Sequence, residues 1–182
     1  AIQSQDVKDR LAKLGAELGL ELWIPKNDRG RDFRGEQLGE IKGVIEALPT
    51  QFNEATTRTI EFIDVLWLRG NSIVAAFEVE STTSIYSGLL RMSDLVALQP
   101  NLNIPLFIVA PDDKRAKVAN QIQRPTFKLR EPPLSTICGF LPFSGLVTKI
   151  EGARTLGLVS ALRPDFLSQV AEYFAEDETE ED

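Results

Sequence analysis

Three acidic residues stand inside two strongly apolar segments and are of a type that binds hard metal ions. Asp64 lies within the run 63–68, and Glu78 and Glu80 lie one residue apart at the end of the run 73–80. An ionised carboxylate is costly to bury unless a cation compensates its charge. Carboxylate oxygens are preferred ligands of Mg²⁺. The two segments therefore predict a metal site within a buried hairpin.

The length of the turn decides whether the three carboxylates can meet. Residues 59–68 and 72–80 have strand-like composition and flank a turn signal at 69–71. Because side chains alternate between faces, a two-residue turn would leave Asp64 and Glu78 on opposite faces of the sheet. A three-residue turn, or an equivalent bulge, would place both on one face. We expect the second arrangement.

The order of these acids resembles the PD-(D/E)xK nuclease superfamily, which has the restriction-endonuclease-like fold. Asp64 matches the first acid of the motif and Glu78 the second. Glu80 occupies the position where most members carry lysine, as in a minority of restriction endonucleases that have glutamate there. The resemblance covers about residues 36 to 127.

The resemblance implies that Asp64 and Glu78 bind Mg²⁺, for which Mn²⁺ can substitute, and that the substrate is DNA. Glu80 would serve as the general base or bind a second ion, provided that burial and neighbouring anions raise its pKa. Two alternatives stay open. The missing lysine could mark an inactive copy, or the acids could lie on a solvated face, as Glu61 of the same hairpin is expected to do.

A helix before the hairpin is predicted from Leu38, Ile41, Ile45 and Leu48, which follow helical spacing. In the resembling fold such a helix often adds one more glutamate to the metal site. Glu36 is the residue we assign to this role, with Glu40, one turn further on, as the alternative. Lys42 on the same helix is a candidate replacement for the missing lysine.

The segment after Glu80 is expected to contact DNA. The hydroxyl-bearing residues Ser81, Thr82, Thr83 and Ser84 form a helix-start signal, and their hydroxyls and backbone amides could meet phosphate oxygens there. Arg91, in the helix that follows, is expected to look into the site. The alternative is a capped helix start without a ligand.

The surrounding elements predict an α/β fold with a mixed central sheet flanked by helices. A helix should follow the glutamates and end near Pro100, and an apolar strand over 104–110 should come next. A helix between two buried strands implies parallel pairing. The other expected elements are a helix through residues 7–18, a strand at 22–24, a helix at 113–123, a strand at 136–143 and a helix at 164–175.

Composition excludes several kinds of chemistry. The 182 residues include no histidine and one cysteine, which rules out Ser-His and Cys-His catalysis, ordinary zinc sites and disulfides. Cys138 is expected to be a buried apolar residue. No apolar run approaches the roughly 18 residues that a membrane-spanning helix needs. A cytoplasmic protein is the expectation.

The net charge of −7 is concentrated at one end of the chain. Residues 176–182 contain six acids and no base, so the remainder carries −1. We expect a single domain over residues 1–175 and a disordered acidic tail over 176–182. Basic residues gather at 29–34, 114–117 and 124–130 and could form a footprint for DNA.

The sequence thus favours a Mg²⁺-dependent DNA endonuclease from a restriction, defence or repair system. The alternative is a catalytically inactive domain of the same fold that binds DNA or a protein. A homodimer, or a place within a larger multidomain protein, is compatible with either hypothesis.

Overall fold

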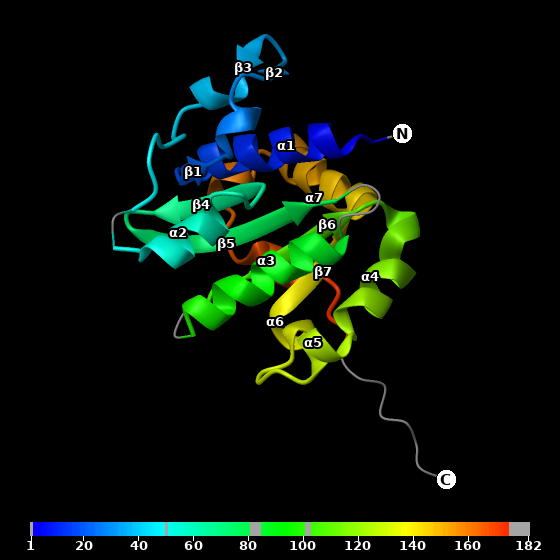
Figure 1. Ribbon diagram of the computed structural model, residues 1–182. Helices are drawn as coiled ribbons and strands as arrows, with labels where there is room; N and C mark the ends of the chain where they lie inside the picture. Colours follow the sequence, from blue (N-terminus) through cyan, green and yellow to red (C-terminus); the bar gives the residue numbers. More distant parts are fainter. Residues whose placement is uncertain (1, 50, 81–84, 101–102, 175–182) are drawn as a thin grey trace.

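The central sheet of the computed structural model has five strands in the order β1-β4-β5-β6-β7 (Figure 1). The structure describes residues 2–49, 51–80, 85–100 and 103–174. The pairs β1–β4 and β4–β5 are antiparallel, whereas β5–β6 and β6–β7 are parallel. The strands are β1 (Glu21–Trp23), β4 (Val65–Arg69), β5 (Ser72–Val79), β6 (Leu106–Ala110) and β7 (Cys138–Pro142). The predicted α/β fold with a mixed sheet is confirmed.

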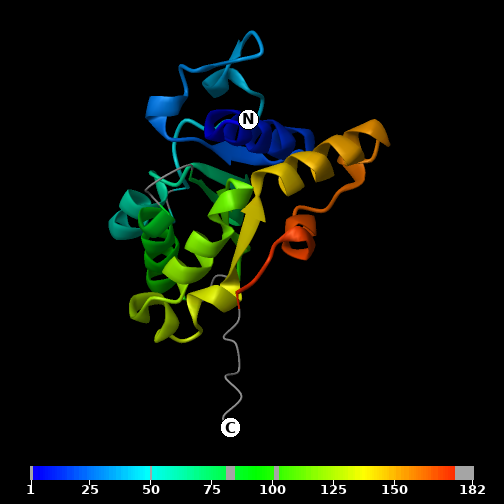
Figure 2. The same ribbon diagram turned by 90° about the vertical axis from the view of Figure 1, so that its right-hand side faces the viewer.

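Helices cover both faces of the sheet (Figure 2). One face packs on α1 and α7 and the other on α3 and α4, and each face has its own core of buried apolar side chains. The helices are α1 (Ser4–Glu17), α2 (Glu54–Ile60), α3 (Ile85–Leu98), α4 (Arg115–Ile122), α5 (Pro125–Lys128), α6 (Leu134–Ile137), α7 (Phe143–Thr155) and α8 (Phe166–Val170). Short 3₁₀ turns lie at Lys26–Asp28, Leu38–Glu40, Asp112–Lys114 and Val159–Ala161.

The connection from β5 through α3 to β6 is the predicted parallel crossover. Val79 pairs with Val109 in the parallel ladder, and α3 packs Leu89 and Met92 against the sheet. The crossover places the carboxyl end of β5 beside the first turns of α3. Helix α3 therefore faces the segment that carries Glu78 and Glu80.

The β4–β5 hairpin has a bulge instead of a longer turn. Arg69 pairs with Ser72 across a two-residue turn, but the register shifts between Trp67 and Leu68. Val65 consequently pairs with Phe77, which brings the preceding Asp64 opposite Glu78. The expected equivalent bulge is thus present, and Asp64 and Glu78 share a face because one extra residue resets the alternation.

The predicted helix over residues 36–48 was wrong. The chain there forms a small hairpin of β2 (Asp32–Phe33) and β3 (Glu36–Gln37), followed by a 3₁₀ turn and a loop. Gly43 interrupts any helix in this region, since its φ of +105 is not helical and is rarely adopted by residues other than glycine. Its carbonyl accepts a hydrogen bond from the amide of Leu22. The apolar spacing arose from loop side chains that pack on the core.

Four helices were not predicted, namely α2, α7 and the short α5 and α6. Helix α2 lies mostly before the segment 59–68 expected to be strand and overlaps its first two residues, and its N-cap Asn53 accepts a hydrogen bond from the amide of Thr56 at 2.8 Å. Helix α7 follows β7 directly and buries Leu146 and Ile150. Glu61, expected in the hairpin, lies instead at the end of α2. The expected helix at 164–175 is reduced to α8.

Candidate metal and catalytic site

The three acids of the hairpin converge at one end of the sheet. Asp64 immediately precedes β4, Glu78 is the second-to-last residue of β5, and Glu80 follows that strand. One carboxylate oxygen from each lies within 4.8 Å of the others. The bulge and the i, i+2 spacing together account for this convergence, because they place all three side chains on one face.

Asp64 is fixed by two contacts. Its Oδ2 accepts a hydrogen bond from the amide of Val79 at 2.7 Å, which ties it to the neighbouring strand. Its Oδ1 forms an ion pair with Nζ of Lys8 at 3.1 Å. Lys8 comes from α1, which packs on the opposite face of the sheet from α3. An ammonium group therefore stands at the edge of the acid cluster.

Glu78 is fully buried and is held by Arg91 from α3. The guanidinium forms a two-pronged contact, Nε to Oε1 at 2.6 Å and a terminal nitrogen to Oε2 at 2.9 Å. Burial raises the pKa of Glu78 well above its ordinary value, and Arg91 opposes this shift while Asp64 adds to it. Arg91 thus points toward the acid cluster, as expected, and its role in binding DNA stays a prediction.

Glu80 is the least compensated member of the cluster. Its side chain is about 10% exposed, and its nearest cation is a terminal nitrogen of Arg91 at 3.6 Å. Burial, with a further contribution from the charge of Asp64, raises the pKa of Glu80 to about 7. Arg91 and Lys8 lower that pKa in part. Near neutral pH this carboxyl can therefore both accept and release a proton.

Gly88 allows α3 to approach the acids closely. A Cβ atom at this position would lie 3.1 Å from Cβ of Glu78 and 3.3 Å from Oε1 of Glu80. Such contacts are tighter than ordinary van der Waals packing. A side chain here would push the helix away from β5 or displace the two glutamates.

The charges within the cluster do not balance when all three acids are ionised. Lys8 and Arg91 supply two positive charges against three negative ones. Burial, and after it the charge of Asp64, raises the pKa of Glu80, and the two cations offset this only in part. A divalent cation would supply the missing charge, and three carboxylates at this spacing suit its preference for hard oxygen ligands. The donor set thus fits Mg²⁺ or Mn²⁺.

The structure does not bring every candidate residue to this site. Glu36 lies in β3 and lines a different pocket, and Glu40 is exposed in a 3₁₀ turn. Lys42 is also exposed. The candidates Ser81, Thr82, Thr83 and Ser84 lie outside the described residues. Within the described ranges, the group of carboxylates at metal-binding distance consists of Asp64, Glu78 and Glu80.

Lys8 was not found by sequence reasoning. It lies more than 50 positions before Asp64 and has no motif around it. The one available signal was its place next to Val7, at the border of the apolar stripe of α1. A lysine at that border can bury its stem and send its ammonium group along the core surface.

A five-stranded mixed α/β sheet that gathers acids at one end is consistent with a restriction-endonuclease-like fold. Residues 3–174 match the family described as the "Type II restriction enzyme NmeDI C-terminal domain". The chain therefore belongs to the NmeDI C-terminal domain family.

A curated protein is also similar to this chain in sequence. The type II restriction enzyme NmeDI of Neisseria meningitidis serogroup C is 34% identical over 125 residues, which are 65% of this chain and 35% of that protein. The chain thus matches about one third of the length of this relative. No solved structure matches. None of the helices that the structure describes is long and apolar enough to cross a membrane.

Proposed function

We propose that this chain is the nuclease domain of a restriction system and hydrolyses DNA phosphodiester bonds with the help of Mg²⁺. The observation that carries the proposal is the convergence of Asp64, Glu78 and Glu80 within 4.8 Å. Membership of the NmeDI C-terminal domain family and the relationship to a type II restriction enzyme support it. The PD-(D/E)xK superfamily is the wider group in which we place the domain.

Asp64 and Glu78 are the residues that would hold the ion. When bound, Mg²⁺ would stabilise the added negative charge on the phosphate and lower the pKa of a coordinated water. Glu78 can offer an oxygen only if Arg91 moves away from it, because the guanidinium contacts both oxygens. The released Arg91 would then be available to a phosphate oxygen.

Glu80 is assigned the role of general base. Its pKa of about 7 matches the requirement that a base be half-ionised near the working pH. Lys8 supplies the positive charge that the motif lacks at the position of Glu80. Its Nζ lies 3.1 Å from Oδ1 of Asp64, so that it orients this carboxylate and retains donors for a substrate oxygen.

A catalytically inactive DNA-binding or protein-binding domain is the second candidate. The observation that favours it is the partial neutralisation of the cluster by Lys8 and Arg91, which could make the acids a structural network. In this case the cations would remain paired with the acids when Mg²⁺ is added. The two candidates therefore differ in metal binding as well as in activity.

Cleavage assays with matched variants separate these candidates. The parent chain is incubated with plasmid, single-stranded and modified DNA in the presence of Mg²⁺ or Mn²⁺. We expect Glu80→Ala and Lys8→Ala each to lower the rate by about 100-fold or more, and Glu80→Ala to leave DNA affinity unchanged or improved, since an anion is removed. Glu40→Gln, which changes an exposed acid outside the cluster, serves as the control. A parent that is inert on all of these substrates would establish the inactive domain.

A further inference from the structure

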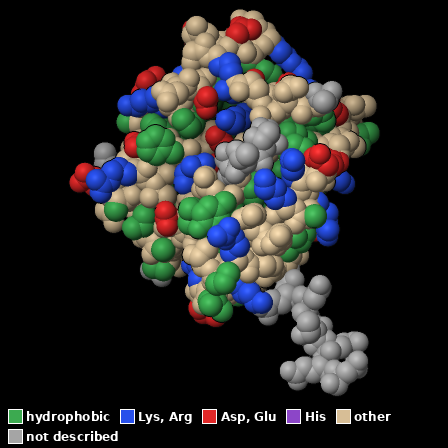
Figure 3. All heavy atoms as spheres, turned by 45° about the vertical axis from the view of Figure 1, so that its right-hand side comes forward, with side chains coloured by type: hydrophobic (Ala, Val, Ile, Leu, Met, Phe, Trp, Pro, Cys, Tyr) green, Lys and Arg blue, Asp and Glu red, His purple; other side chains and the backbone are tan. Residues whose placement is uncertain are grey.

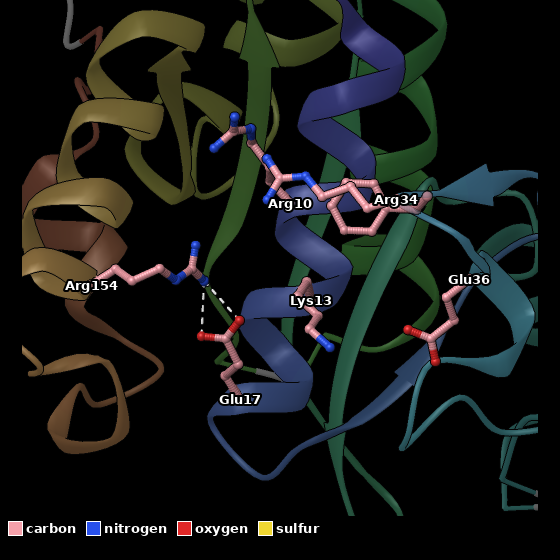
Figure 4. Close-up of a pocket in the computed structure, with 7 residues that line it drawn as sticks. Arg10, Lys13, Glu17, Arg34, Glu36 and Arg154 are labelled. Atoms are coloured by element: carbon pink, nitrogen blue, oxygen red, sulfur yellow. Dashed lines mark hydrogen bonds and ion pairs between the residues drawn. The ribbon is translucent and has the colours of Figure 1, made fainter.

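A second pocket lies between α1, the β2–β3 hairpin and α7, and none of its lining residues belongs to the acid cluster. The cavity measures about 290 Å³. Figure 4 shows side chains from these three parts of the chain around one opening. The lining residues are Arg10, Lys13, Glu17, Phe33, Arg34, Glu36 and Arg154.

The pocket is locally basic although the chain as a whole is acidic. Four cationic side chains face two acidic ones in a chain of net charge −7. One of the two acids is already used, because both oxygens of Glu17 accept hydrogen bonds from Arg154, at 2.7 and 2.8 Å. On the face shown in Figure 3, Lys and Arg side chains are interspersed with hydrophobic and acidic ones.

Two of the four cations are held in place and two keep an unneutralised charge. Arg10 is fixed by Asp6 at 2.7 Å and by Glu151 at 2.5 Å, as Arg154 is by Glu17. Lys13 and Arg34 are exposed, and neither forms an ion pair with a carboxylate in the described part of the chain. An incoming anion would find two positioned guanidinium groups, two cations without a carboxylate partner and one acid, Glu36, that forms no ion pair among the described residues.

Arg34 stands at a backbone position that other residue types fill more easily. It has φ +53 and is followed by Gly35 at φ +88, and together they form the two-residue turn of the β2–β3 hairpin. Turns with two positive φ angles favour Asn, Asp and Gly, since a larger side chain is strained there. Strain of this kind is found where a side chain serves a function. Here it holds the arginine at the mouth of the pocket, with its guanidinium over the ring of Phe33.

The neighbouring arginines of the same loop, Arg29 and Arg31, are already engaged in contacts within the protein. Arg29 donates to the carbonyl of Ile24 at 3.1 Å, and Arg31 is held by Asp9 at 2.7 Å and Asp28 at 3.0 Å. The contact of Arg31 with Asp9 anchors the loop to α1. Arg34 is thus the arginine of this segment whose guanidinium is directed to the pocket without a carboxylate partner among the described residues.

We infer that this pocket binds a phosphate group of the DNA backbone, at a place distinct from the acid cluster. The inference rests on the proposed function for the identity of the partner. A volume of about 290 Å³ lies at the lower end of the range of small-molecule sites and has room for a phosphate group. The chemistry is shared with free phosphate and nucleotides, but an open site with contributions from a projecting hairpin suits a continuous strand (Figure 2).

The test compares two double variants that remove the same charge. Lys13→Gln/Arg34→Asn changes the pocket, and Lys42→Gln/Arg69→Asn changes two exposed cations elsewhere. Binding of each chain to fluorescent duplex DNA is measured between about 50 and 200 mM salt, without metal. For the pocket variant we expect affinity to fall by about threefold to tenfold and the slope of log K against log salt to become shallower by about 1. The control variant should keep the slope of the parent.

Additional measurements separate this inference from the proposed function. The pocket variant should retain the melting temperature of the parent or exceed it, because Asn suits the turn better than Arg, and should retain the cleavage rate at saturating DNA. Inorganic phosphate and a nucleoside triphosphate are titrated as small anions. A pocket variant that binds DNA like the parent but has lost either small anion would overturn the assignment to DNA, as would a parent with no affinity for DNA. A parent chain that binds DNA and does not cleave it would contradict the proposed function. The comparison of DNA binding between the variants would still test the pocket.

Discussion

Replacement of Glu80 by glutamine should make the protein more stable, and only at higher pH. Burial, together with the charge of Asp64, raises the pKa of Glu80 to about 7 from the value of 4.5 expected in the unfolded chain. The folded protein therefore binds this proton more tightly than the unfolded protein does. The stability contributed by the protonated carboxyl is fully present below pH 4.5 and is lost as the pH rises through 7.

The size of the change in the free energy of unfolding follows from the shift in the pKa of Glu80. One pKa unit corresponds to about 1.4 kcal/mol, so ionisation of Glu80 should lower the free energy of unfolding by up to about 3 kcal/mol at pH 8. Glutamine cannot ionise and avoids this loss. For a domain of this size, 3 kcal/mol is equivalent to roughly 6–12 °C in melting temperature. At pH 4.5 parent and variant should have nearly equal stability.

The measurement is chemical or thermal unfolding of parent and Glu80→Gln from pH 4.5 to 8 in the presence of a chelator. Glu40→Gln, at an exposed position, controls for the loss of one negative charge and should follow the parent profile. Added Mg²⁺ should raise the melting temperature of the parent more than that of Glu80→Gln. A difference between parent and Glu80→Gln that is the same at both ends of the pH range would refute the argument that the buried carboxyl is destabilised by ionisation.

Three other outcomes are expected from the same geometry. Gly88→Ala should slow DNA cleavage by about tenfold or more because the new Cβ would crowd Glu78. The control Gly152→Ala, in α7 with open space around it, should be neutral or stabilising. Cleavage rates and melting temperatures test both variants. Mg²⁺ binding near pH 7 should release protons, since the positive charge of the ion lowers the pKa of the neighbouring Glu80, and calorimetry in two buffers of different ionisation enthalpy measures the number of protons. Arg91→Met should destabilise the metal-free protein by about 3–5 kcal/mol through the unpaired Glu78, and Mg²⁺ should restore more stability to this variant than to the parent; equal metal effects would contradict this expectation.

Local sequence pattern was sufficient for the elements around the site. The helix after Glu80 and the strand at 104–110 were predicted because a helical stripe and a short apolar run between prolines are each decided by neighbouring residues. Parallel pairing then followed from the length of the connection. The buried state of Cys138 was likewise evident from its place in an apolar run and is confirmed.

Features that depend on distant contacts could not be predicted in the same way. The spacing at 38–48 imitates a helix because Leu38 and Ile41 both reach the core, although the chain that follows, at Gly43 and Ile45, is held by backbone hydrogen bonds to Leu22 of β1. The bulge beside Leu68 has no local signature, and yet it sets the face on which Asp64 lies. A one-residue slip would have separated the acids, so the site depends on a detail that only the folded sheet shows.

The two cations of the cluster have different relations to the proposed metal ion. Arg91 contacts both oxygens of fully buried Glu78, so an ion bound to this residue would compete with the guanidinium for the same charge. Lys8 contacts a single oxygen of Asp64, and the other oxygen accepts a hydrogen bond from the amide of Val79. In the proposed function, Arg91 compensates Glu78 in the metal-free protein and gives way to the ion, whereas Lys8 stays beside Asp64 when the ion is bound.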